Sequence, residues 1–567
     1  MKCRPMYMPV LFLLVTAACA AQFNPYKYQV QKNIAVRNGA VVSAHPLASK
    51  AGLSMLKQGG NAVDAAIATQ LALAVVYPGA GNLGGGGFMV ACLKNGKKIA
   101  LDYRETAPAA ASRDMYLDAG GNANMQLSQD GHLAAGIPGT VAGLFASLKY
   151  AKLPFKKLIA PAIILAEKGF AVTKEQAEDF NAYKKEFEAL NTSPVAFVKN
   201  EPWKEGDTLV QKDLANTLKR IRDFGQKGFY EGETASFITN EMSKGKGIIT
   251  KEDLKNYAAR ERTVMDFNYK NYRIITMPLP SSGGIILQQL LGMVEKKNIA
   301  AMKFQTPESV QLIIEAERRA YADRAAYLGD ADFVHVPVKR LTSKGYIHAR
   351  MMDYTPGKAG SSNDIKEGAI AESEETTHLS VMDKDGNAVA VTTTLNGHFG
   401  SRTVVSGAGF ILNNEMDDFS VKPGVPNMYG AVGNEKNAIA PGKRMLSSMT
   451  PTIVLKGNSP YIVMGTPGGT TIPTSVFQAL INIFEFGMTA ADAINKPKFH
   501  HQWLPDVIFA EEDFNASTLQ ALTAMGYTVQ KREPIGRTEI IMLKQTGTRK
   551  LMIAAGDKRG NDCAEGY

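Results

Sequence analysis

An abrupt change of pattern at Thr376 is the strongest constraint in this 567-residue sequence. Residues 357–375 are rich in Gly, Ser, Asn, Asp and Glu, which predicts an exposed, mobile connector. From Thr376 onward polar and apolar residues alternate, and Asp385-Gly386 is a strong hairpin turn signal. Asn387–Leu395 continues as a second strand. We therefore expect a hairpin that begins where the connector ends.

The ends of this hairpin bring polar side chains together. If its turn has two residues, antiparallel pairing places Thr377 opposite Thr394 and Thr376 opposite Leu395. Asn396 follows at once, so two hydroxyl groups and an amide converge beside the connector. Threonine is also a favoured strand residue, so this geometry alone fits ordinary strand chemistry equally well.

Regular elements flank the hairpin on both sides. Residues 46–58 predict a helix that ends at Gly59-Gly60, and Asn61 is expected to cap a second helix that packs on one face. Strands with helices packed on them predict a layered α and β fold. Four further elements are expected: a hairpin over Phe88–Leu101, a helix from Thr306-Pro307 toward Gly329, a strand over Thr452–Met464 and a helix over about Pro473–Phe486.

The N-terminus has the features of an export signal. Residues 1–20 combine Lys2 and Arg4 with an apolar run and a small-residue cleavage pattern, which predicts a signal peptide and an exported protein, periplasmic or secreted. Lipid tethering at Cys19 is the lesser alternative, because Thr16 stands where a lipidation signal has an aliphatic residue. No later segment reaches the roughly 20 uninterrupted apolar residues of a membrane span.

Composition and isolated motifs exclude several classes of function. The formal net charge is +10, but Lys and Arg are scattered and form no basic helix, so nucleic-acid binding is not expected. Cys92 and Cys563 are too far apart in sequence to predict a disulfide or a metal site. The adjacent His500 and His501 have no nearby ligand cluster and are interpreted as structural. Gly84–Gly87 lacks the Lys-Ser or Lys-Thr of a phosphate loop.

Ordered motifs extend over nearly the whole chain. They are Gly59-Gly60-Asn61-Ala62-Val63-Asp64-Ala65-Ala66, Gly81-Asn82-Leu83-Gly84-Gly85-Gly86-Gly87-Phe88, Asp102 with Arg104-Glu105 before Ala107-Pro108, Thr376-Thr377-His378, Asp385-Gly386-Asn387-Ala388-Val389, Thr394-Leu395-Asn396, Leu412-Asn413-Asn414, Met416-Asp417-Asp418-Phe419, Leu446-Ser447-Ser448-Met449 and Pro467-Gly468-Gly469. In this order they resemble the γ-glutamyltranspeptidase family, although each motif alone is a weak signal.

The resemblance implies an α+β fold, the four-layer αββα sandwich of the N-terminal-nucleophile hydrolases. It also implies one precursor that cuts itself between Glu375 and Thr376. The products would be a large subunit, residues 21–375, and a small catalytic subunit, residues 376–567, joined as a heterodimer. The cut would give Thr376 a free α-amino group with a pKa of about 7.7 to 8.0, which can accept the proton of its own hydroxyl group.

Site residues follow from the resemblance, position by position. Thr376 would be the nucleophile, Thr394 would orient it, and the N–H groups of Gly468 and Gly469 would bind the oxyanion. The donor is an amino-acid zwitterion, so its α-carboxylate needs a cation and its α-amino group needs anions. The residues implied for these contacts are Arg104 with Ser447 and Ser448 for the carboxylate, Asp418, Glu415 and Asn396 for the amine, and Tyr429 in a lid loop over Pro423–Gly430.

The implied activity is ping-pong transfer of a γ-glutamyl group through an ester on Thr376. The donors would be glutathione and related γ-glutamyl compounds, the acceptors amino acids, peptides or water, and no cofactor or metal is expected. One alternative is a sibling acylase, either a cephalosporin acylase or a poly-γ-glutamate-processing enzyme. Another is an exported binding protein that is neither processed nor catalytic. For Arg104 and Glu105 the alternative is an ion pair on the protein surface.

Overall fold

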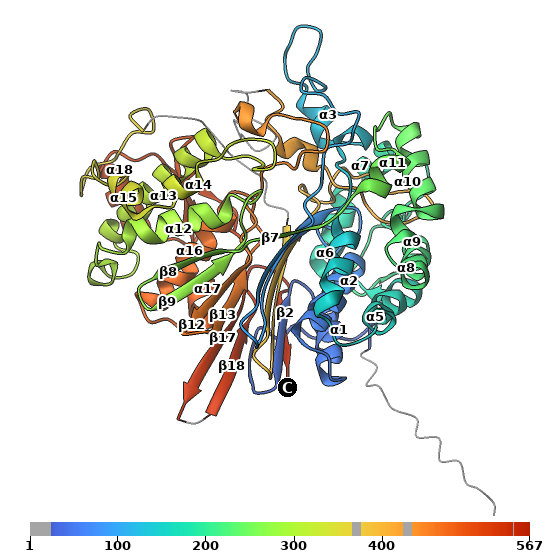
Figure 1. Ribbon diagram of the computed structural model, residues 1–567, viewed down its shortest axis with the longest axis horizontal. Helices are drawn as coiled ribbons and strands as arrows, with labels where there is room; N and C mark the ends of the chain where they lie inside the picture. The colour runs from blue at the N-terminus through green and yellow to red at the C-terminus, as the bar shows by residue number, and fades with distance from the viewer. Residues whose placement is uncertain (1–23, 366–375, 423–433, 548) are drawn as a thin grey trace, which may run out of the picture.

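Two seven-stranded antiparallel sheets lie face to face, and each carries helices on its outer side (Figure 1). This computed structural model describes residues 24–365, 376–422, 434–547 and 549–567. The layers confirm the predicted αββα sandwich. The predicted signal peptide, residues 1–20, lies outside the described residues, as do Glu375 and the lid segment with Tyr429.

The first sheet contains the predicted hairpin at its centre. All its neighbouring strands pair antiparallel. In spatial order its strands are β19 (Cys563–Gly566), β2 (Gly39–Ser43), β10 (Thr376–Asp383), β11 (Ala388–Thr394), β3 (Gly86–Cys92), β4 (Lys98–Asp102) and β7 (Arg260–Arg262). Strands from both sides of residue 376 are therefore interleaved in this sheet.

The second sheet is built in the same mixed way, and its neighbours also pair antiparallel. Its spatial order is β1 (Asn33–Val36), β18 (Arg549–Ala555), β17 (Glu539–Thr546), β13 (Ser459–Gly465), β12 (Thr452–Lys456), β9 (Tyr272–Thr276) and β8 (Met265–Tyr269). Two small sheets lie outside the sandwich, one of β14 (Phe499–His500), β15 (Ile508–Glu511) and β16 (Val529–Arg532), the other of β5 (Phe170–Ala171) and β6 (Thr208–Leu209).

Helices divide between the two outer faces (Figure 1). The helices on the side of the first sheet include α1 (Pro46–Lys57), α2 (Ala62–Val76), α4 (Thr140–Ser147), α5 (Phe155–Lys168), α6 (Lys174–Ala182), α7 (Lys184–Leu190), α8 (Lys212–Phe224), α9 (Lys227–Tyr230), α10 (Gly232–Lys244) and α11 (Lys251–Asn256), with α3 (Met125–Gln129) nearby. Those on the side of the second sheet include α12 (Gly283–Val294), α13 (Pro307–Tyr327), α14 (Val338–Leu341), α15 (Lys344–Ala349), α16 (Thr471–Phe484), α17 (Ala490–Asn495) and α18 (Ala516–Ala524).

Apolar side chains from both sheets fill the space between them. Val42 and Phe88 of the first sheet belong to the same buried cluster as Ile275, Ile453 and Ile541 of the second. Strand side chains alternate between two faces, so the other face of each strand remains for the helices. The central strands are thus largely buried on both sides, as inner layers of a sandwich must be, whereas edge strands such as β7 and β8 keep exposed residues.

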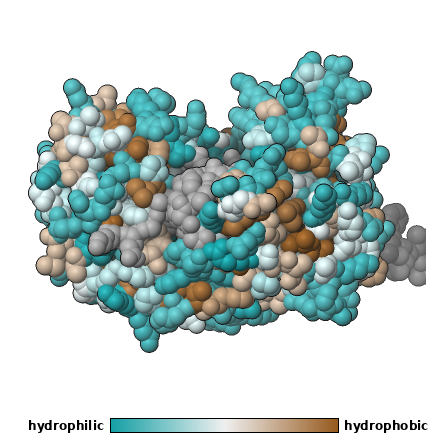
Figure 2. All heavy atoms as spheres, turned by 90° about the horizontal axis from the view of Figure 1, so that it is seen from above, coloured by the Kyte–Doolittle hydropathy of each residue, from teal (hydrophilic) through white to brown (hydrophobic). Residues whose placement is uncertain are grey.

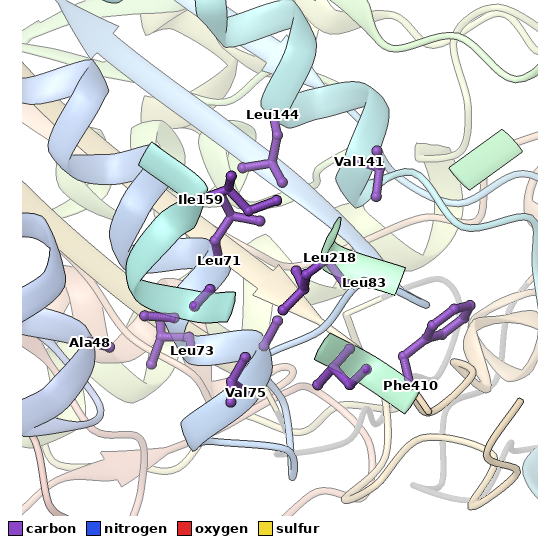
Figure 3. Packing of buried hydrophobic residues seen from close by; sticks show 14 of the residues in the cluster. Ala48, Leu71, Leu73, Val75, Leu83, Val141, Leu144, Ile159, Leu218 and Phe410 are labelled. Carbon is purple, nitrogen blue, oxygen red and sulfur yellow. The ribbon is translucent and has the colours of Figure 1, made fainter. Parts of the chain in front are cut away.

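The core on the side of the first sheet shows why one helix differs from its prediction. In Figure 3, Leu71, Leu73 and Val75 of α2 lie among apolar residues of neighbouring elements, such as Ala48 of α1 and Ile159 of α5. All 15 residues of α2 are buried, so the prediction that it packs on one face is wrong. Its many alanines allow neighbouring elements to approach on every side.

The hairpin exists, but its register differs by one residue from the prediction. Thr376 lies opposite Thr394, whereas the sequence prediction placed Thr377 there. The turn is longer than two residues: the N–H of Asp383 donates to Asn387 O (3.1 Å), and Gly386 has a left-handed φ of 87°. A turn that ends in a left-handed glycine is the usual form of a three-residue hairpin loop.

The other predicted elements are largely confirmed. The hairpin around Asn95-Gly96, both helices near the N-terminus and the long helix after Thr306 are present. The segment predicted as one strand over Thr452–Met464 is two strands, β12 and β13, because Gly457 turns the chain with a φ of 62°. The following helix begins at Thr471, slightly before the predicted Pro473.

The start of the connector is held in place, contrary to the prediction that residues 357–375 are exposed throughout. Ser362 and Ile365 are buried, and the indole N–H of Trp503 lies 3.0 Å from both of their carbonyl oxygens. The carboxylate of Asp506 accepts a hydrogen bond from the N–H of Ser362 at 2.8 Å. The described part of the connector is therefore anchored to the segment after β14.

One face of the molecule has the surface character of an ordinary globular protein (Figure 2). Hydrophilic residues cover most of the face seen in Figure 2, and apolar residues gather in smaller patches between them. In the described part of the chain, no helix combines the length and apolar character that a membrane crossing requires.

The interface between the sheets gives a prediction about stability. Ile453 is fully buried between the sheets, whereas Ile164 on α5 is 38% exposed. Ile453→Ala should lower the free energy of unfolding by about 2 to 5 kcal/mol, because it removes buried methyl groups and leaves a cavity. Ile164→Ala is the matched control and should cost much less. Thermal unfolding midpoints measure both, and equal shifts would contradict a tightly packed interface.

Candidate active site

A small polar pocket lies where β10 begins and β11 ends. It is narrow, and its lining is mainly polar. Its walls come from segments far apart in sequence, on both sides of residue 376. The lining residues are Arg104, Thr376, Thr394, Asn396, Asp418, Ser447, Ser448, Met449, Gly469 and Ile472.

Strand pairing fixes the position of Thr376 in this pocket. Thr376 is the first residue of β10 and pairs with Thr394, the last residue of β11. The end of β11 is held by Asn82, whose side-chain amide donates to Thr394 O at 2.8 Å. A Cβ on Gly85 would lie 2.1 Å from that oxygen, so the glycine run before β3 permits this close approach.

Asparagines shape the segment after β11. Asn396 has a φ of 74°, a left-handed conformation that Asn tolerates better than most residues. Its N–H donates to the hydroxyl oxygen of Thr394 at 2.8 Å, and its amide donates to Asn414 O at 3.0 Å. The side-chain oxygen of Asn413 accepts from the N–H of Glu415 at 3.0 Å. Local hydrogen bonds thus position Thr394, Asn396 and Glu415 together.

Arg104 is the central cation of the pocket. It follows the end of β4 and is almost fully buried, so the alternative of a surface ion pair with Glu105 is wrong. One guanidinium nitrogen lies 2.5 Å from Glu415 Oε2, and another donates to the carboxylate of Asp418. Glu105 is more distant, at 3.5 Å. Arg104 therefore joins three acidic side chains in a space from which water is largely excluded.

Burial shifts the acid–base properties of this cluster. It raises the pKa of Glu105 to about 8, against the opposing attraction of Arg104. Burial likewise raises the pKa of Glu415 and of Asp418, again opposed by Arg104. The single positive charge of one guanidinium group cannot neutralise three carboxylates. The protonated form of these acidic side chains is therefore favoured.

The serine pair is supported by residues that the sequence interpretation missed. The hydroxyl oxygen of Ser448 accepts from the guanidinium of Arg324 at 3.2 Å, and Ser282 bridges Arg324 (2.9 Å) and the carbonyl of Ser447 (2.8 Å). Burial lowers the pKa of Arg324 to about 10. The spacing of residues in the sequence could have indicated Arg324. This residue lies three and four positions after Tyr321 and Ala320, and therefore on the core face of α13.

Two glycines precede α16 at the edge of the pocket. Gly468 and Gly469 have φ values of 133° and 55°, and a Cβ on Gly468 would lie 2.4 Å from the hydroxyl of Thr471. Their carbonyl groups accept from the N–H groups of Thr471 (2.9 Å) and Ile472 (3.1 Å). Neither glycine N–H donates to another described residue. At Gly468, glycine is required by both conformation and space.

The structure thus brings most of the predicted site residues together. Glu415 does not line the pocket itself but touches it through Arg104. Gly468 lines a neighbouring pocket, and its successor Gly469 lines this one. Met449 and Ile472 were not predicted and supply the apolar part of the wall. Glu375 and Tyr429 lie outside the described residues.

Other candidate residues have structural surroundings. His500 and His501 are buried and bond to Thr474 (2.9 Å) and Asp506 (3.1 Å), in agreement with the structural interpretation. Cys92 and Cys563 are both buried free thiols. Among the residues that the structure describes, no group of three or more His, Cys, Asp or Glu side chains has the arrangement of a metal site.

The architecture defines a class of protein. Two antiparallel sheets between helical layers, with a threonine at the start of a central strand facing a polar pocket, form an N-terminal-nucleophile hydrolase fold. The sequence model of the γ-glutamyltranspeptidase family matches residues 48–567. The chain belongs to this family.

Individual relatives agree with that assignment. The glutathione hydrolase proenzyme of Escherichia coli (strain K12) is 46% identical over 561 residues, which cover 97% of this chain and 96% of the relative. Cephalosporin acylase from Bacillus halodurans has a similar structure, with a TM-score of 0.82, 27% identity and coverage of 96% of this chain and 99% of that one. Helicobacter pylori γ-glutamyltranspeptidase gives a TM-score of 0.57 at 45% identity, covering 60% of this chain and 96% of that one.

The buried acidic cluster predicts a pH dependence of stability. The folded protein keeps a proton on Glu105 up to about pH 8, whereas the unfolded chain loses it near the ordinary value of 4.5. Stability therefore falls as the pH rises through this interval. Glu105→Gln removes the titrating group, so its unfolding midpoint should fall less between pH 5 and pH 8 than that of the wild type.

The exposed Glu201 provides the control for this experiment. Glu201→Gln should show the same loss of stability between the two pH values as the wild type does. A Glu105→Gln protein with an undiminished pH dependence would contradict the assignment of that proton to Glu105.

Proposed function

We propose that this protein is a γ-glutamyltransferase and glutathione hydrolase that is made as a precursor and activated by its own cleavage. The observation that carries the proposal is the convergence of Thr376, Arg104 and Asp418 on one small pocket. Membership of the γ-glutamyltranspeptidase family supports it, as does the Escherichia coli relative named a glutathione hydrolase proenzyme.

The first step is cleavage between Glu375 and Thr376. The Thr376 hydroxyl attacks the preceding carbonyl carbon, and water opens the ester that results. Residues 21–375 and 376–567 then form the large and small subunits of a heterodimer. Because each of the two sheets contains paired strands from both segments, the fold itself holds the products together.

Cleavage turns Thr376 into both nucleophile and base. Its free α-amino group takes the hydroxyl proton, which an amide nitrogen does not do. The hydroxyl oxygen then attacks the γ-carbonyl carbon of the donor, and Thr394, its partner across the hairpin, orients it. The product is a γ-glutamyl ester on Thr376, which water, an amino acid or a peptide releases. No cofactor takes part in these steps.

When the Thr376 oxygen attacks, negative charge develops on the carbonyl oxygen of the donor, near Gly468 and Gly469. Their N–H groups stand before the first turn of α16, where backbone donors accumulate and negative charge is favoured. Loss of one such donor typically costs about 3 to 4 kcal/mol of transition-state stabilisation. We assign these glycines as the oxyanion hole.

The Arg104–Asp418 ion pair is suited to a zwitterion. The α-carboxylate and α-ammonium groups of a glutamyl donor lie on one carbon, and the pocket presents opposite charges side by side. Arg104, with Ser447 and Ser448, would bind the carboxylate. Asp418 would bind the ammonium group, with Glu415 and Asn396 beside it. Tyr429 is assigned to a lid over this pocket from the family resemblance alone.

Two alternatives follow from the same fold. The structural similarity to a cephalosporin acylase favours the first, a sibling acylase, but such an enzyme has no need of the paired charges of Arg104 and Asp418. The second is a binding protein that is never cut. Export to the periplasm or beyond remains a proposal that rests on residues 1–20, with lipid tethering at Cys19 as the lesser alternative.

Replacement of the nucleophile tests processing. Thr376→Ala should give one band on a denaturing gel where the wild type gives two, the smaller being residues 376–567, because alanine has no hydroxyl to attack the peptide bond. Thr377→Ala is the control, since this neighbour is also buried but points to the other face of β10. Cleavage of Thr376→Ala, or full activity of an uncut wild type, would refute the mechanism.

A pair of chromogenic anilides tests donor recognition. The processed wild type should release p-nitroaniline from the γ-glutamyl compound much faster than from the glutaryl compound, which lacks the α-ammonium group. Asp418→Asn should lower kcat/KM for the γ-glutamyl anilide about tenfold to a hundredfold, since it removes a charge-assisted contact. The glutaryl rate should change less.

The outcomes separate the alternatives. Equal rates on the two anilides would favour a sibling acylase. Release from neither anilide by correctly cut protein would exclude the γ-glutamyl assignment and favour a binding protein.

A further inference from the structure

The start of the connector bonds to one face of α13. Gln311, Glu315 and Arg318 follow one another along this helix at intervals of four and three positions, so their side chains share that face. The N–H of Gly357 donates to Gln311 Oε1 at 2.8 Å. The N–H of Gly360 donates to Glu315 Oε1 at 3.1 Å. The connector therefore runs along the helix from its first residue.

Arg318 and the segment after β14 hold the next part of the connector. The hydroxyl oxygen of Ser362 accepts from the guanidinium of Arg318, and the N–H of Ser362 donates to Asp506 Oδ2 at 2.8 Å. The indole N–H of Trp503 lies 3.0 Å from the carbonyl oxygens of both Ser362 and Ile365. An ion pair joins Arg318 to Asp506. We call Arg318, Trp503 and Asp506 the connector clamp.

Most of the connector clamp lies inside the protein. Arg318 is fully buried, Ser362 and Trp503 are 2% and 5% exposed, and the side chain of Asp506 is 38% exposed. Trp503 and Ile365 belong to the same apolar cluster on the side of the second sheet. Burial keeps away the water that would compete for these hydrogen bonds. Ser362 and Ile365 are therefore held more firmly than contacts on the surface would hold them.

The connector clamp fixes one end of the span that leads to the proposed cleavage site. The other end is Thr376, which is fixed by the pairing of β10 with β11. Ten residues, 366–375, separate Ile365 from Thr376. A chain held at both ends has fewer conformations the shorter it is, and each doubling of its length makes a given arrangement about threefold rarer. Without the connector clamp, the span would reach back at least to Gly360.

We propose that the connector clamp positions the chain for self-cleavage. By restricting the connector, it keeps the Glu375–Thr376 bond within reach of the Thr376 hydroxyl, and this inference rests on the proposed function. In the step that it assists, the hydroxyl oxygen bonds to the carbonyl carbon of Glu375, the C–N bond breaks, and the nitrogen takes the hydroxyl proton. Such an attack is faster when the reacting atoms are held close together. None of the clamp residues lines the pocket of Thr376, so the later reaction with donors does not need them.

Lengthening the connector on either side of the connector clamp tests the proposal. Ten Gly and Ser residues inserted between Ile365 and Lys366 double the span to Thr376 and should slow cutting about threefold. The same insertion between the exposed Pro356 and Gly357 is the matched control and should leave the rate unchanged, because it lies before the connector clamp. Each full-length chain is made by cell-free translation, synthesis is stopped, and conversion to two bands is followed on denaturing gels.

A pair of tryptophan variants tests the connector clamp itself. Trp503→Phe should slow cutting about threefold to fivefold, because phenylalanine keeps the aromatic packing but lacks the N–H that holds two carbonyl groups. Trp203→Phe is the control, since Trp203 is 8% exposed and its N–H donates to Phe197 O at 2.7 Å and not to the connector. Once cut, both variants should match the wild type in kcat/KM for the γ-glutamyl anilide. A purely structural role would lower both unfolding midpoints without a difference between the two cutting rates.

The outcomes separate this inference from the proposed function. Equal cutting rates within each pair would overturn the connector clamp as a positioning device, and so would slow cutting accompanied by an equal loss of kcat/KM in the cut protein. If Trp503→Phe fails to fold, the two insertions decide. A wild type that is never cut would overturn self-cleavage and the role of the connector clamp together. A wild type that is cut normally but releases nothing from the anilide would overturn the γ-glutamyl assignment alone.

Discussion

The pairing of β10 on both of its edges is the constraint on which the rest of the structure depends. β10 pairs with β11 from its first residue, Thr376, and with β2 from Leu379 onward. A strand held on both sides keeps its position when the chain before it changes, so its first residue is fixed by the sheet and not by the connector. The pocket is built around that fixed residue.

A second constraint is electrostatic. The pocket places Arg104 among Glu105, Glu415 and Asp418, all shielded from water. Such a cluster costs desolvation energy, and an apolar core of similar volume is often at least as stable. Its presence beside the first residue of β10 is therefore better explained by what the charges bind than by what they add to stability.

Much of the fold was predictable from local patterns. Glycine turns, asparagine caps and alternation located most strands and helices near the site, and the resemblance to a family gave the layers. The hairpin register was missed because Asp385-Gly386 has the same composition in a two-residue and a three-residue turn, and only the backbone of Gly386 separates the two. The one-residue difference moved Thr376, not Thr377, opposite Thr394.

The site residues that belong to sequence motifs were predictable. The residues that only packing brings to the site were not. Arg324 and Ser282 support the serine pair from α13 and the residue before α12, and no short motif connects them. The complete burial of α2 also depends on neighbours distant in sequence. Periodicity describes one helix at a time, so it does not reveal how many elements surround that helix.

Strands from both sides of residue 376 are interleaved in the sheets. This interleaving determines the order in which folding and cleavage take place. In the first sheet β10 and β11 lie between β2 and β3, so neither segment has a complete sheet of its own. An intact chain assembles these sheets in a unimolecular reaction, whereas severed pieces would have to find each other at a rate that depends on concentration. Under the proposed cleavage before Thr376, folding must therefore come first and scission second, and a denatured mature protein would lack the covalent link that guided its assembly.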